Sequence, residues 1–206
     1  MELIVATHNK GKVAEFARLF ADYEVVLLPL DAIGIGVEVE ETGKTFAENA
    51  RIKAETIFAL TGKPTIADDS GLCVDALGGA PGVYSARYGG PGLDDRGRLE
   101  RLLDEMKDVP AEKRGAHFAC AICCVLPEMT VETSGVCKGS ILTAPRGENG
   151  FGYDPVFLPD EYRASGRSFA ELSQQEKNAI SHRGAALRNL YESLVKYGAL
   201  EKRAGV

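Results

Sequence analysis

The stretch Pro64-Thr65-Ile66-Ala67-Asp68-Asp69-Ser70-Gly71-Leu72-Cys73-Val74 joins two short apolar runs through a polar segment. The apolar runs are typical of strands, so we interpret Asp68–Gly71 as an acidic corner between two strands. Carboxylates near a core cost several kcal/mol unless they are compensated, which is comparable to the stability of a whole protein. One interpretation of the segment is a polar turn, since Asp, Ser and Gly are common turn formers. The other is a divalent-metal or acid/base site. The stretch alone leaves both open.

Size and charge narrow the class of protein. The chain has 206 residues, which suits one domain or one domain with two lobes. Hydrophobic residues make up 45% and charged residues 26%, as in ordinary globular proteins. The formal net charge is −6 and there is no long basic run, so we expect no nucleic-acid partner. A small anion held by a few local Lys and Arg side chains remains compatible with this charge.

Compartment signals indicate the cytoplasm. Met1–Val5 has neither the basic start nor the apolar length of a signal peptide. No stretch approaches the roughly 18 apolar residues that cross a bilayer, so we expect no membrane partner. Five cysteines, an odd number, fit a reducing compartment better than a disulfide framework.

The spacing His117-x-x-Cys120-x-x-Cys123 superficially suggests a zinc site. However, residues 116–126 are predicted to form a strand, in which a spacing of three directs side chains to opposite faces. We therefore expect buried structural cysteines that behave as small hydrophobic residues.

The N-terminal region combines a strand and a helix. Leu3–Ala6 is a continuous apolar run typical of a buried strand, and Thr7–Lys12 interrupts it. Apolar residues then recur at helical spacing, at Val13, Phe16, Ala17 and Phe20. Glu15 and Arg18 are expected on the opposite face of this helix. Free N–H groups and the helix dipole favour an anion at such a helix start. A capped helix with solvated lysines is the structural alternative.

Residues 45–62 carry the signals of a second helix. Thr45 and Glu48 form a capping-box pattern, and Gly62 marks the end. Asn49 and Lys53 are four residues apart and therefore share a face. Just before this helix, the pair Glu40-Glu41 has the ligand chemistry of a metal site but is also compatible with solvated acids.

The middle of the chain alternates loops and regular elements. Six glycines and two prolines in residues 78–92 preclude a regular element and indicate a shaped, functional loop. Asp94 or Asp95 is placed to cap a helix with apolar residues at Leu99, Leu102, Leu103 and Met106. The segments 118–126 and 130–141 are predicted to be strands joined as a hairpin.

A second glycine-rich loop spans residues 145–155 and contains two aromatic residues. Phe151 and Tyr153 are suited to flank a planar ring by stacking, and Asp154 is suited to accept hydrogen bonds from ring or ribose donors. A core aromatic pair is the structural alternative. Residues 156–158 are predicted to form a short strand.

Capping patterns mark the C-terminal helices. Ser173-Gln174-Gln175-Glu176 opens a short helix, and Ser181 precedes the last long one. The buried face of the last helix is expected to contain Leu187, Leu190, Tyr191, Leu194 and Val195. His182 and Arg183 lie in its first turn, where each positive charge opposes the helix dipole by about 0.3–1 kcal/mol. Contact with a ligand would explain this misfit.

Together these stretches suggest a nucleoside triphosphate site in which Mg²⁺ bridges carboxylates to phosphates. The sequence resembles the inosine triphosphate pyrophosphatases, also called XTP/dITP diphosphatases, which clear deaminated purine nucleotides. The resemblance rests on motifs in order from residue 7 to residue 187: Thr7-His8-Asn9-x-Gly11-Lys12, Glu40-Glu41-Thr42-Gly43-x-Thr45-Phe46, Ala67-Asp68-Asp69-Ser70-Gly71-Leu72, residues 78–88, Gly150-Phe151-Gly152-Tyr153-Asp154-Pro155, Glu176-Lys177-Asn178 and Ile180-Ser181-His182-Arg183-Gly184.

The resemblance implies an elongated α/β mixed-sheet fold with two lobes, the nucleotide between them, and usually a homodimer. It implies that residues 1–206 form one pyrophosphatase domain that hydrolyses ITP, dITP or XTP to the monophosphate and pyrophosphate with Mg²⁺. It assigns Glu40 and Asp69 to the metal, Asp69 also as the base, and Ser70 to the substrate. Phosphate contacts are assigned to Thr7, His8, Asn9, Lys10, Gly11 and Lys12, and the nucleoside and base pocket to Phe151, Gly152, Tyr153, Asp154, Lys177, His182 and Arg183.

Several points stay open at the level of sequence. A carboxylate bound directly to Mg²⁺ is a poor proton acceptor, so either Asp69 touches the metal through water or Asp68 shares the work. Fixed donors such as Arg183 would reject adenine, which has an amino group in place of the 6-oxo acceptor. Alternatives are a pyrimidine triphosphate pyrophosphatase, a nucleotide-binding sensor without turnover, and a phosphatase that releases single phosphates.

Overall fold

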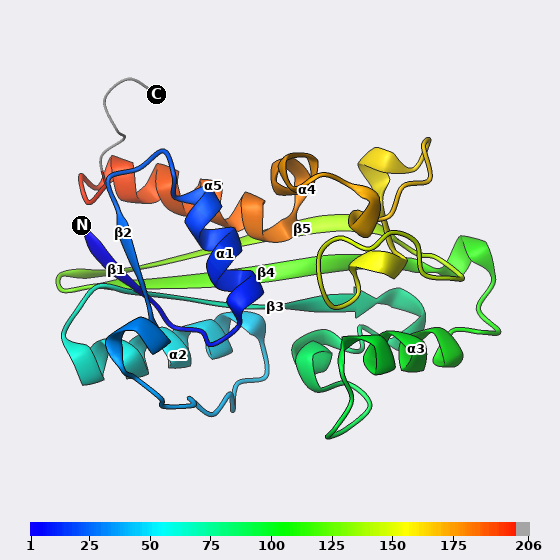
Figure 1. Ribbon diagram of the computed structural model, residues 1–206, viewed down its shortest axis with the longest axis horizontal. Coiled ribbons are helices and arrows are strands. Elements are labelled where there is room, and N and C mark those ends of the chain that lie inside the picture. Colours follow the sequence, from blue (N-terminus) through cyan, green and yellow to red (C-terminus); the bar gives the residue numbers. More distant parts are fainter. Residues whose placement is uncertain (201–206) are drawn as a thin grey trace. The chain divides into compact units, whose positions relative to one another are not determined.

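The computed structural model describes residues 1–200 and has a mixed α/β fold (Figure 1). Its helices are α1 (Lys10–Leu19), α2 (Phe46–Thr61), α3 (Asp95–Glu105), α4 (Gln174–Ile180) and α5 (His182–Lys196). Its strands are β1 (Glu2–Val5), β2 (Val26–Pro29), β3 (Thr65–Val74), β4 (Gly115–Leu126), β5 (Met129–Ile141) and β6 (Phe157–Pro159). None of the helices in residues 1–200 is both long and apolar enough to span a membrane.

The strands form one mixed sheet in the order β2-β1-β3-β4-β5-β6. β1 pairs in parallel with β2 and with β3, whereas β6 pairs antiparallel with β5. The predicted mixed-sheet α/β fold is therefore confirmed.

The predicted acidic corner at Asp68–Gly71 is wrong, because β3 runs unbroken from Thr65 to Val74. The prediction assumed that two adjacent carboxylates must leave the strand to reach solvent. They remain in the strand because cationic and amide side chains from other elements compensate them.

The residue contacts divide the chain into two compact units. Unit 1 contains residues 1–69, 120–135 and 183–200, and unit 2 contains residues 70–119 and 136–182. β3, β4 and β5 each contribute residues to both units.

Unit 1 has a helix layer on each face of its strands (Figure 1). On one face, α1 and α5 contribute Phe16, Phe20, Leu187 and Leu190 to a cluster with Leu3, Val5, Ile66 and Ile122. On the other face, α2 contributes Ala50, Ala54 and Ile57 to a cluster with Ile4, Ala6, Ala67 and Val125. Consecutive strand residues thus alternate between the two clusters, as the pleat of a strand requires.

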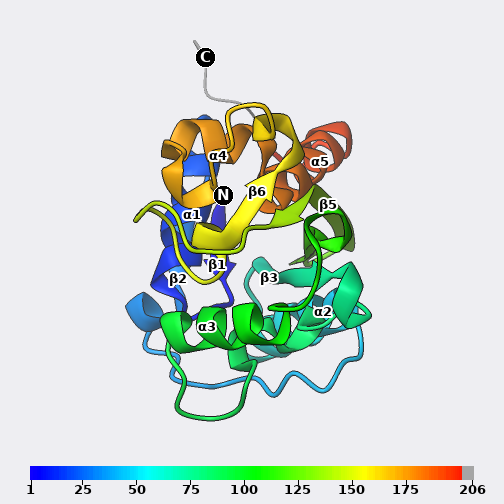
Figure 2. The same ribbon diagram turned by 90° about the vertical axis from the view of Figure 1, so that its right-hand side faces the viewer.

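Unit 2 has its own hydrophobic core. α3 contributes two buried residues, Leu99 and Leu102, and its C-cap residue Met106 is buried beside them. They belong to one cluster with buried residues from β3, β4 and β5: Leu72, Val74, Phe118 and Ile141. Figures 1 and 2 place α3 on one side of the strands of this unit and α4 on the other.

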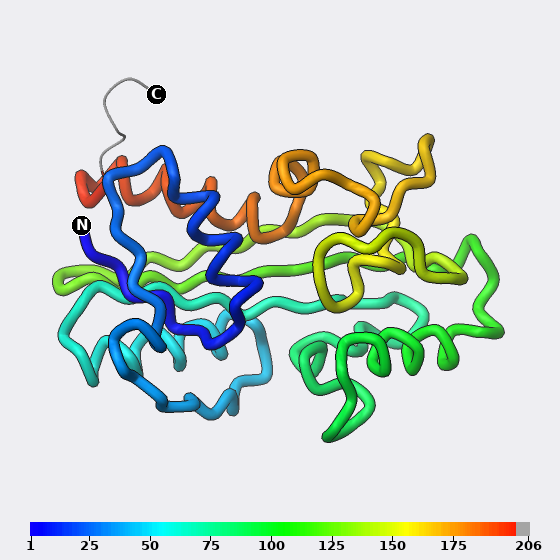
Figure 3. The backbone as a smooth tube through the Cα atoms, viewed as in Figure 1, coloured from blue at the N-terminus to red at the C-terminus, as the bar shows by residue number. Residues whose placement is uncertain are grey.

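The hairpin and the buried cysteines agree with the sequence predictions. A tight turn after Leu126 joins β4 to β5 (Figure 3). Cys120 and Cys123 are both buried and free, and they belong to opposite hydrophobic clusters of unit 1. A spacing of three in a strand has therefore separated them as expected.

Most helix predictions are confirmed, with four exceptions. The capping boxes of α2 and α4 and the Asp94 cap of α3 are present. Glu15, expected on the solvent face of α1, is buried, whereas Ala17 is exposed. Val195, expected on the buried face of α5, is 46% exposed. The segment Gly82–Arg87, expected to be irregular, forms a 3₁₀ helix.

Candidate functional site

The N-terminal loop of unit 1 is organised by a helix cap. The Asn9 side chain accepts a hydrogen bond from the Lys12 N–H at 3.1 Å, and the Asn9 N–H donates to Thr7 Oγ1 at 3.2 Å. His8 contacts an Asp31 carboxylate oxygen at 2.9 Å and the Val37 carbonyl at 3.2 Å. The predicted phosphate residues thus lie together at the start of α1, where the cap already uses one N–H group.

Asp68 lies at the centre of a buried ion-pair network in unit 1. Its Oδ2 atom is 3.0 Å from Lys12 Nζ and accepts hydrogen bonds from Arg183 Nε and Nη2 at 3.1 Å each. Burial alone raises the pKa of Asp68, but the charges of Lys12 and Arg183 outweigh it and hold that pKa well below its usual range. Asp68 is therefore an ionised carboxylate that neutralises two cations.

Arg183 is a fully buried cation with two carboxylate partners. Besides Asp68, it contacts Glu15 through Nη1, and the side chains of both Arg183 and Glu15 are at most 3% exposed. This explains why Glu15 is not on the solvent face of its helix. It also accounts for a cation in the first turn of α5, because protein carboxylates offset the unfavourable dipole. The dipole misfit therefore does not by itself require a ligand.

Asp69 has a different environment from Asp68. Its Oδ2 atom accepts a hydrogen bond from Asn49 Nδ2 at 3.0 Å, and its Oδ1 atom is 3.9 Å from Lys53 Nζ. Burial raises the pKa of Asp69; the charge of Lys53 opposes this rise and that of Glu41 adds to it. The shared face of Asn49 and Lys53, expected from their spacing, is the face of α2 that meets Asp69.

The two adjacent glutamates of unit 1 differ in position. Glu41 is half-buried and contacts Lys53 Nζ at 2.5 Å, whereas Glu40, the predicted metal ligand, is exposed. Lys53 is thus an ammonium group between the carboxylates of Glu41 and Asp69. Burial lowers the pKa of Lys53, but the surrounding carboxylates outweigh burial and raise it.

In unit 2, Asp154 organises the turn that carries the predicted nucleoside residues. The Asp154 carboxylate accepts a hydrogen bond from the Phe151 N–H at 2.9 Å and pairs with Lys177 Nζ at 2.6 Å. The ammonium group of Lys177 lies 5.0 Å from the centroid of the Phe151 ring. A Cβ atom at Gly150, where φ is +80°, would meet Asp154 Oδ2 at 2.0 Å, so this turn requires glycine.

The two aromatic residues of this turn are not equivalent. Phe151 is 37% exposed, whereas Tyr153 is buried in the core of unit 2. The Tyr153 hydroxyl donates a hydrogen bond to the Ser85 carbonyl at 3.0 Å. Burial raises the pKa of Tyr153, so the phenol remains protonated and able to donate. Phe151 is thus the aromatic residue with an open ring.

The remaining predicted residues of unit 2 are partly or wholly covered. His182 is buried and stacks on Phe118, with ring centroids 4.8 Å apart and an interplanar angle of 11°. Ser70 is half-buried in β3.

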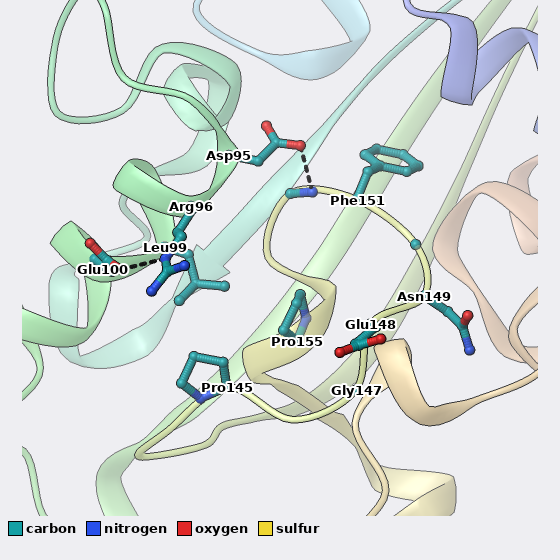
Figure 4. Close-up of a pocket in the computed structure, with 12 residues that line it drawn as sticks. Asp95, Arg96, Leu99, Glu100, Pro145, Gly147, Glu148, Asn149, Phe151 and Pro155 are labelled. Carbon is teal, nitrogen blue, oxygen red and sulfur yellow. Dashed lines mark hydrogen bonds and ion pairs between the residues drawn. The ribbon is translucent and has the colours of Figure 1, made fainter.

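A pocket of about 460 Å³ lies between α3 and the 145–155 loop within unit 2 (Figure 4). The side chains of Leu99 and Arg96 from α3 face Pro145 and Pro155 of the loop. Its wall includes Phe151 and Gly152, two of the predicted nucleoside residues.

Several residues that contact predicted site residues are not indicated as such by the sequence, among them Glu15, Asp31, Ser85 and Asp95. Each contacts a residue far away in the chain, and neither helical periodicity nor a capping pattern carries such information. Asn49 and Lys53 were recognised only as sharing a helix face.

A model of the Ham1 family matches residues 3–193. The chain belongs to the Ham1 family. Among its relatives, proteins named dITP/XTP pyrophosphatase from Bacillus cereus and Streptomyces avermitilis are 48% and 50% identical over 95% and 91% of this chain, and over 96% and 94% of their own.

Solved structures agree with this family membership. A HAM1 protein from Coxiella burnetii superposes with a TM-score of 0.85 at 41% identity, covering 95% of this chain and 99% of that one. A protein from Mycobacterium abscessus described as a nucleoside-triphosphatase or dITP/XTP pyrophosphatase gives a TM-score of 0.74 at 46% identity, covering 92% and 98%.

Proposed function

We propose that the chain hydrolyses ITP, dITP and XTP to the nucleoside monophosphate and pyrophosphate, and so removes deaminated purines from the nucleotide pool. The names of Ham1 relatives at about half identity over nearly their whole length supply the reaction class. In this reaction, a water oxygen attacks the α-phosphorus, the bond to the bridging oxygen breaks, and pyrophosphate leaves.

The observation that carries the proposal is the division between two adjacent carboxylates. Asp68 is already committed to Lys12 and Arg183, so it neutralises charge rather than accepting a proton. Asp69 is held by the neutral amide of Asn49 and is 3.9 Å from its nearest ammonium group. We assign Asp69 as the base that takes the proton of the attacking water.

The proposed phosphate contacts come from the start of α1 and from Ser70. Thr7, His8, Asn9, Lys10, Gly11 and Lys12 provide N–H groups, a hydroxyl and two ammonium groups. Lys12 is held by Asp68, which fixes the position of its charge. Donors that are fixed before the reaction stabilise the developing charge without having to reorganise.

The residues of unit 1 fit Mg²⁺ bound together with the substrate. Residues 1–200 contain no group of three or more His, Cys, Asp or Glu side chains that could hold a metal ion on its own. Mg²⁺ is commonly bound by one or two carboxylates plus substrate phosphates, and we propose Glu40 and Asp69 for this role. Asp69 would contact the ion through water, because a carboxylate bound directly to Mg²⁺ is a poor proton acceptor. Glu41 is less suited because it pairs with Lys53. When bound, Mg²⁺ would neutralise charge on the triphosphate.

The proposed nucleoside residues of unit 2 are Phe151, Gly152, Tyr153, Asp154, Lys177 and His182, and Arg183 of unit 1 is the other residue proposed for the base. Phe151 offers an open ring for stacking on the base. Arg183 already donates to Asp68 and Glu15, so backbone N–H groups near His182 are the better candidates for the 6-oxo group. Adenine would leave such donors unpaired.

We further propose that residues 1–206 make up a single pyrophosphatase domain, and that the protein acts as a cytoplasmic homodimer on a small-molecule nucleotide. The negative net charge is consistent with the absence of a nucleic-acid partner. Light scattering coupled to size exclusion tests the dimer.

The test is turnover of ITP, XTP, dITP, GTP, ATP and dUTP with Mg²⁺, with pyrophosphate and phosphate measured separately. We expect rapid pyrophosphate release from the first three nucleotides. Preference for dUTP would identify a pyrimidine enzyme, release of single phosphates a phosphatase, and binding without products a sensor. Any of these three results would refute the proposal.

A further inference from the structure

The turn that carries Phe151 is held by two carboxylates of unit 2. Asp154 accepts the Phe151 N–H from within the loop. Asp95, at the start of α3, accepts the Gly152 N–H at 3.0 Å (Figure 4). Consecutive N–H groups of one turn are thus fixed by one residue of the loop and one residue 57 positions away.

Asp95 is itself held in place and is not the cap of its helix. Its Oδ1 atom pairs with Arg98 Nη2 at 2.6 Å, one turn further along α3, while its Oδ2 atom takes the Gly152 N–H. The cap is Asp94, whose side chain accepts the Gly97 N–H at 2.8 Å. The cap and the contact with the turn therefore belong to different, adjacent residues.

The pocket between α3 and the 145–155 loop explains why the hydrogen bond between Asp95 and Gly152 matters for the position of the turn. Side chains of α3 and of the loop line this pocket of about 460 Å³ and leave its interior open. The Asp95–Gly152 hydrogen bond crosses from the helix to the turn at its margin (Figure 4). Without this bond, the turn has space into which it can move.

We propose that Asp95 is a positioning residue that fixes the Phe151–Gly152 turn and thereby sets the affinity for the base of the nucleotide. The inference rests on the proposed function, because it assumes that Phe151 stacks on the base. Asp95 acts through the backbone of Gly152 and does not touch the substrate. A displaced turn weakens base binding in the ground state and the transition state alike, which raises KM and leaves kcat unchanged.

The test compares Asp95→Ala, Asp95→Asn and Asp94→Ala. We expect Asp95→Ala to raise KM for ITP about 5- to 10-fold, which is within the net range of a single lost hydrogen bond, with kcat within about twofold. Asp95→Asn keeps an oxygen acceptor for Gly152 and should recover most of the wild-type KM. Asp94→Ala removes the cap, so it should lower the melting temperature and leave KM unchanged.

Hydrogen exchange at the Gly152 amide provides a readout independent of activity. We expect faster exchange in Asp95→Ala than in Asp94→Ala or the wild type. A wild-type KM in Asp95→Ala, or an equal rise of KM in Asp94→Ala, overturns the inference. If the wild-type protein releases no pyrophosphate, the proposed function is refuted. In that case hydrogen exchange still tests the positioning role, which is refuted if exchange at Gly152 is unchanged in Asp95→Ala.

Discussion

In unit 1 the residues around Asp68 and Asp69 are held by a network of buried charges. In unit 2 the Phe151–Asp154 turn has a buried ion pair, between Asp154 and Lys177, and its backbone is held through N–H groups. Asp68 and Arg183 have side chains that are at most 2% exposed and compensate each other. The turn instead donates its N–H groups to Asp154 and Asp95, and its residue Phe151 is 37% exposed.

The difference predicts two kinds of sensitivity to substitution. A buried ion network loses several kcal/mol when one member is removed, because the remaining charges stay unpaired in a medium of low dielectric constant. A turn held by single hydrogen bonds loses about 0.5–1.5 kcal/mol per bond and can shift without unfolding the protein. We therefore expect substitutions in unit 1 to affect catalysis or folding, and those in the turn to affect affinity.

The largest expected effect is that of Asp69→Asn. Loss of a general base lowers kcat by about 10²–10⁴-fold, and Asn still accepts the Asn49 hydrogen bond, so the fold should persist. Steady-state turnover of ITP and thermal unfolding measure the two effects separately. Near-normal turnover with Mg²⁺ still bound would show that Asp69 is not the base.

Asp68→Asn is the matched control for that assignment. It leaves the Lys12 and Arg183 charges without their carboxylate and should destabilise the protein strongly, which Asp69→Asn should not. If Asp68→Asn folds normally and loses only turnover, the roles of the two carboxylates are exchanged.

Arg183→Met should be the most destabilising of the cation substitutions. It leaves Asp68 and Glu15 buried without their guanidinium partner, at a cost of about 3–5 kcal/mol in the free energy of unfolding. Arg51→Ala, which breaks the pair with Glu132 on the surface of the same unit, should cost only about 0.2–1 kcal/mol. Urea denaturation of both variants measures the difference, and equal losses would contradict a central role for the buried network.

Local sequence signals predicted much of the fold. The capping patterns at Thr45 and Ser173 and the glycine-rich loops depend on residues a few positions apart, so they can be read directly from the chain. The fold class followed from the family resemblance. The helix starts predicted from these capping patterns agree with the structure.

Two of the errors, at Glu15 and at the predicted corner Asp68–Gly71, arose where distant residues compensate charge. Glu15 and Arg183 are 168 positions apart, and nothing near Glu15 in the sequence indicates a buried partner. The corner predicted at Asp68–Gly71 failed for the same reason, since Arg183, Lys12 and Asn49 come from three other helices. The candidate site residues come from motifs and remain predictions, whereas the separate environments of Asp68 and Asp69 required the structure.

Substitutions of the two aromatic residues in the unit 2 turn should separate affinity from stability. Phe151→Ala removes a ring that is open for stacking, which is worth about 1–3 kcal/mol per base, so KM for ITP should rise about 5- to 150-fold. Tyr153→Phe removes the hydrogen bond to the Ser85 carbonyl, so it should cost about 1–3 kcal/mol in stability and leave KM unchanged. A KM effect of Tyr153→Phe as large as that of Phe151→Ala would indicate that the Tyr153 hydroxyl, directly or through the position of the turn, also controls nucleotide binding.

The smallest expected effect concerns His8, which lies in the loop before α1 but outside the buried network. The hydrogen bond to Asp31 is the main cause that raises the pKa of His8 above its ordinary value of 6.5, and the Val37 carbonyl adds to it. Because the folded protein favours the protonated ring, its stabilising contribution is fully present below pH 6.5 and is lost as the pH rises through the folded-state pKa. The side chain is 35% exposed, so this contribution should stay below about 1 kcal/mol.

An NMR titration measures the pH at the midpoint of His8 protonation, and the variant His8→Gln assigns its signal among the three histidines. Asp31→Asn should lower that midpoint toward its ordinary value, and an unchanged midpoint would mean that Asp31 does not control the charge of this loop.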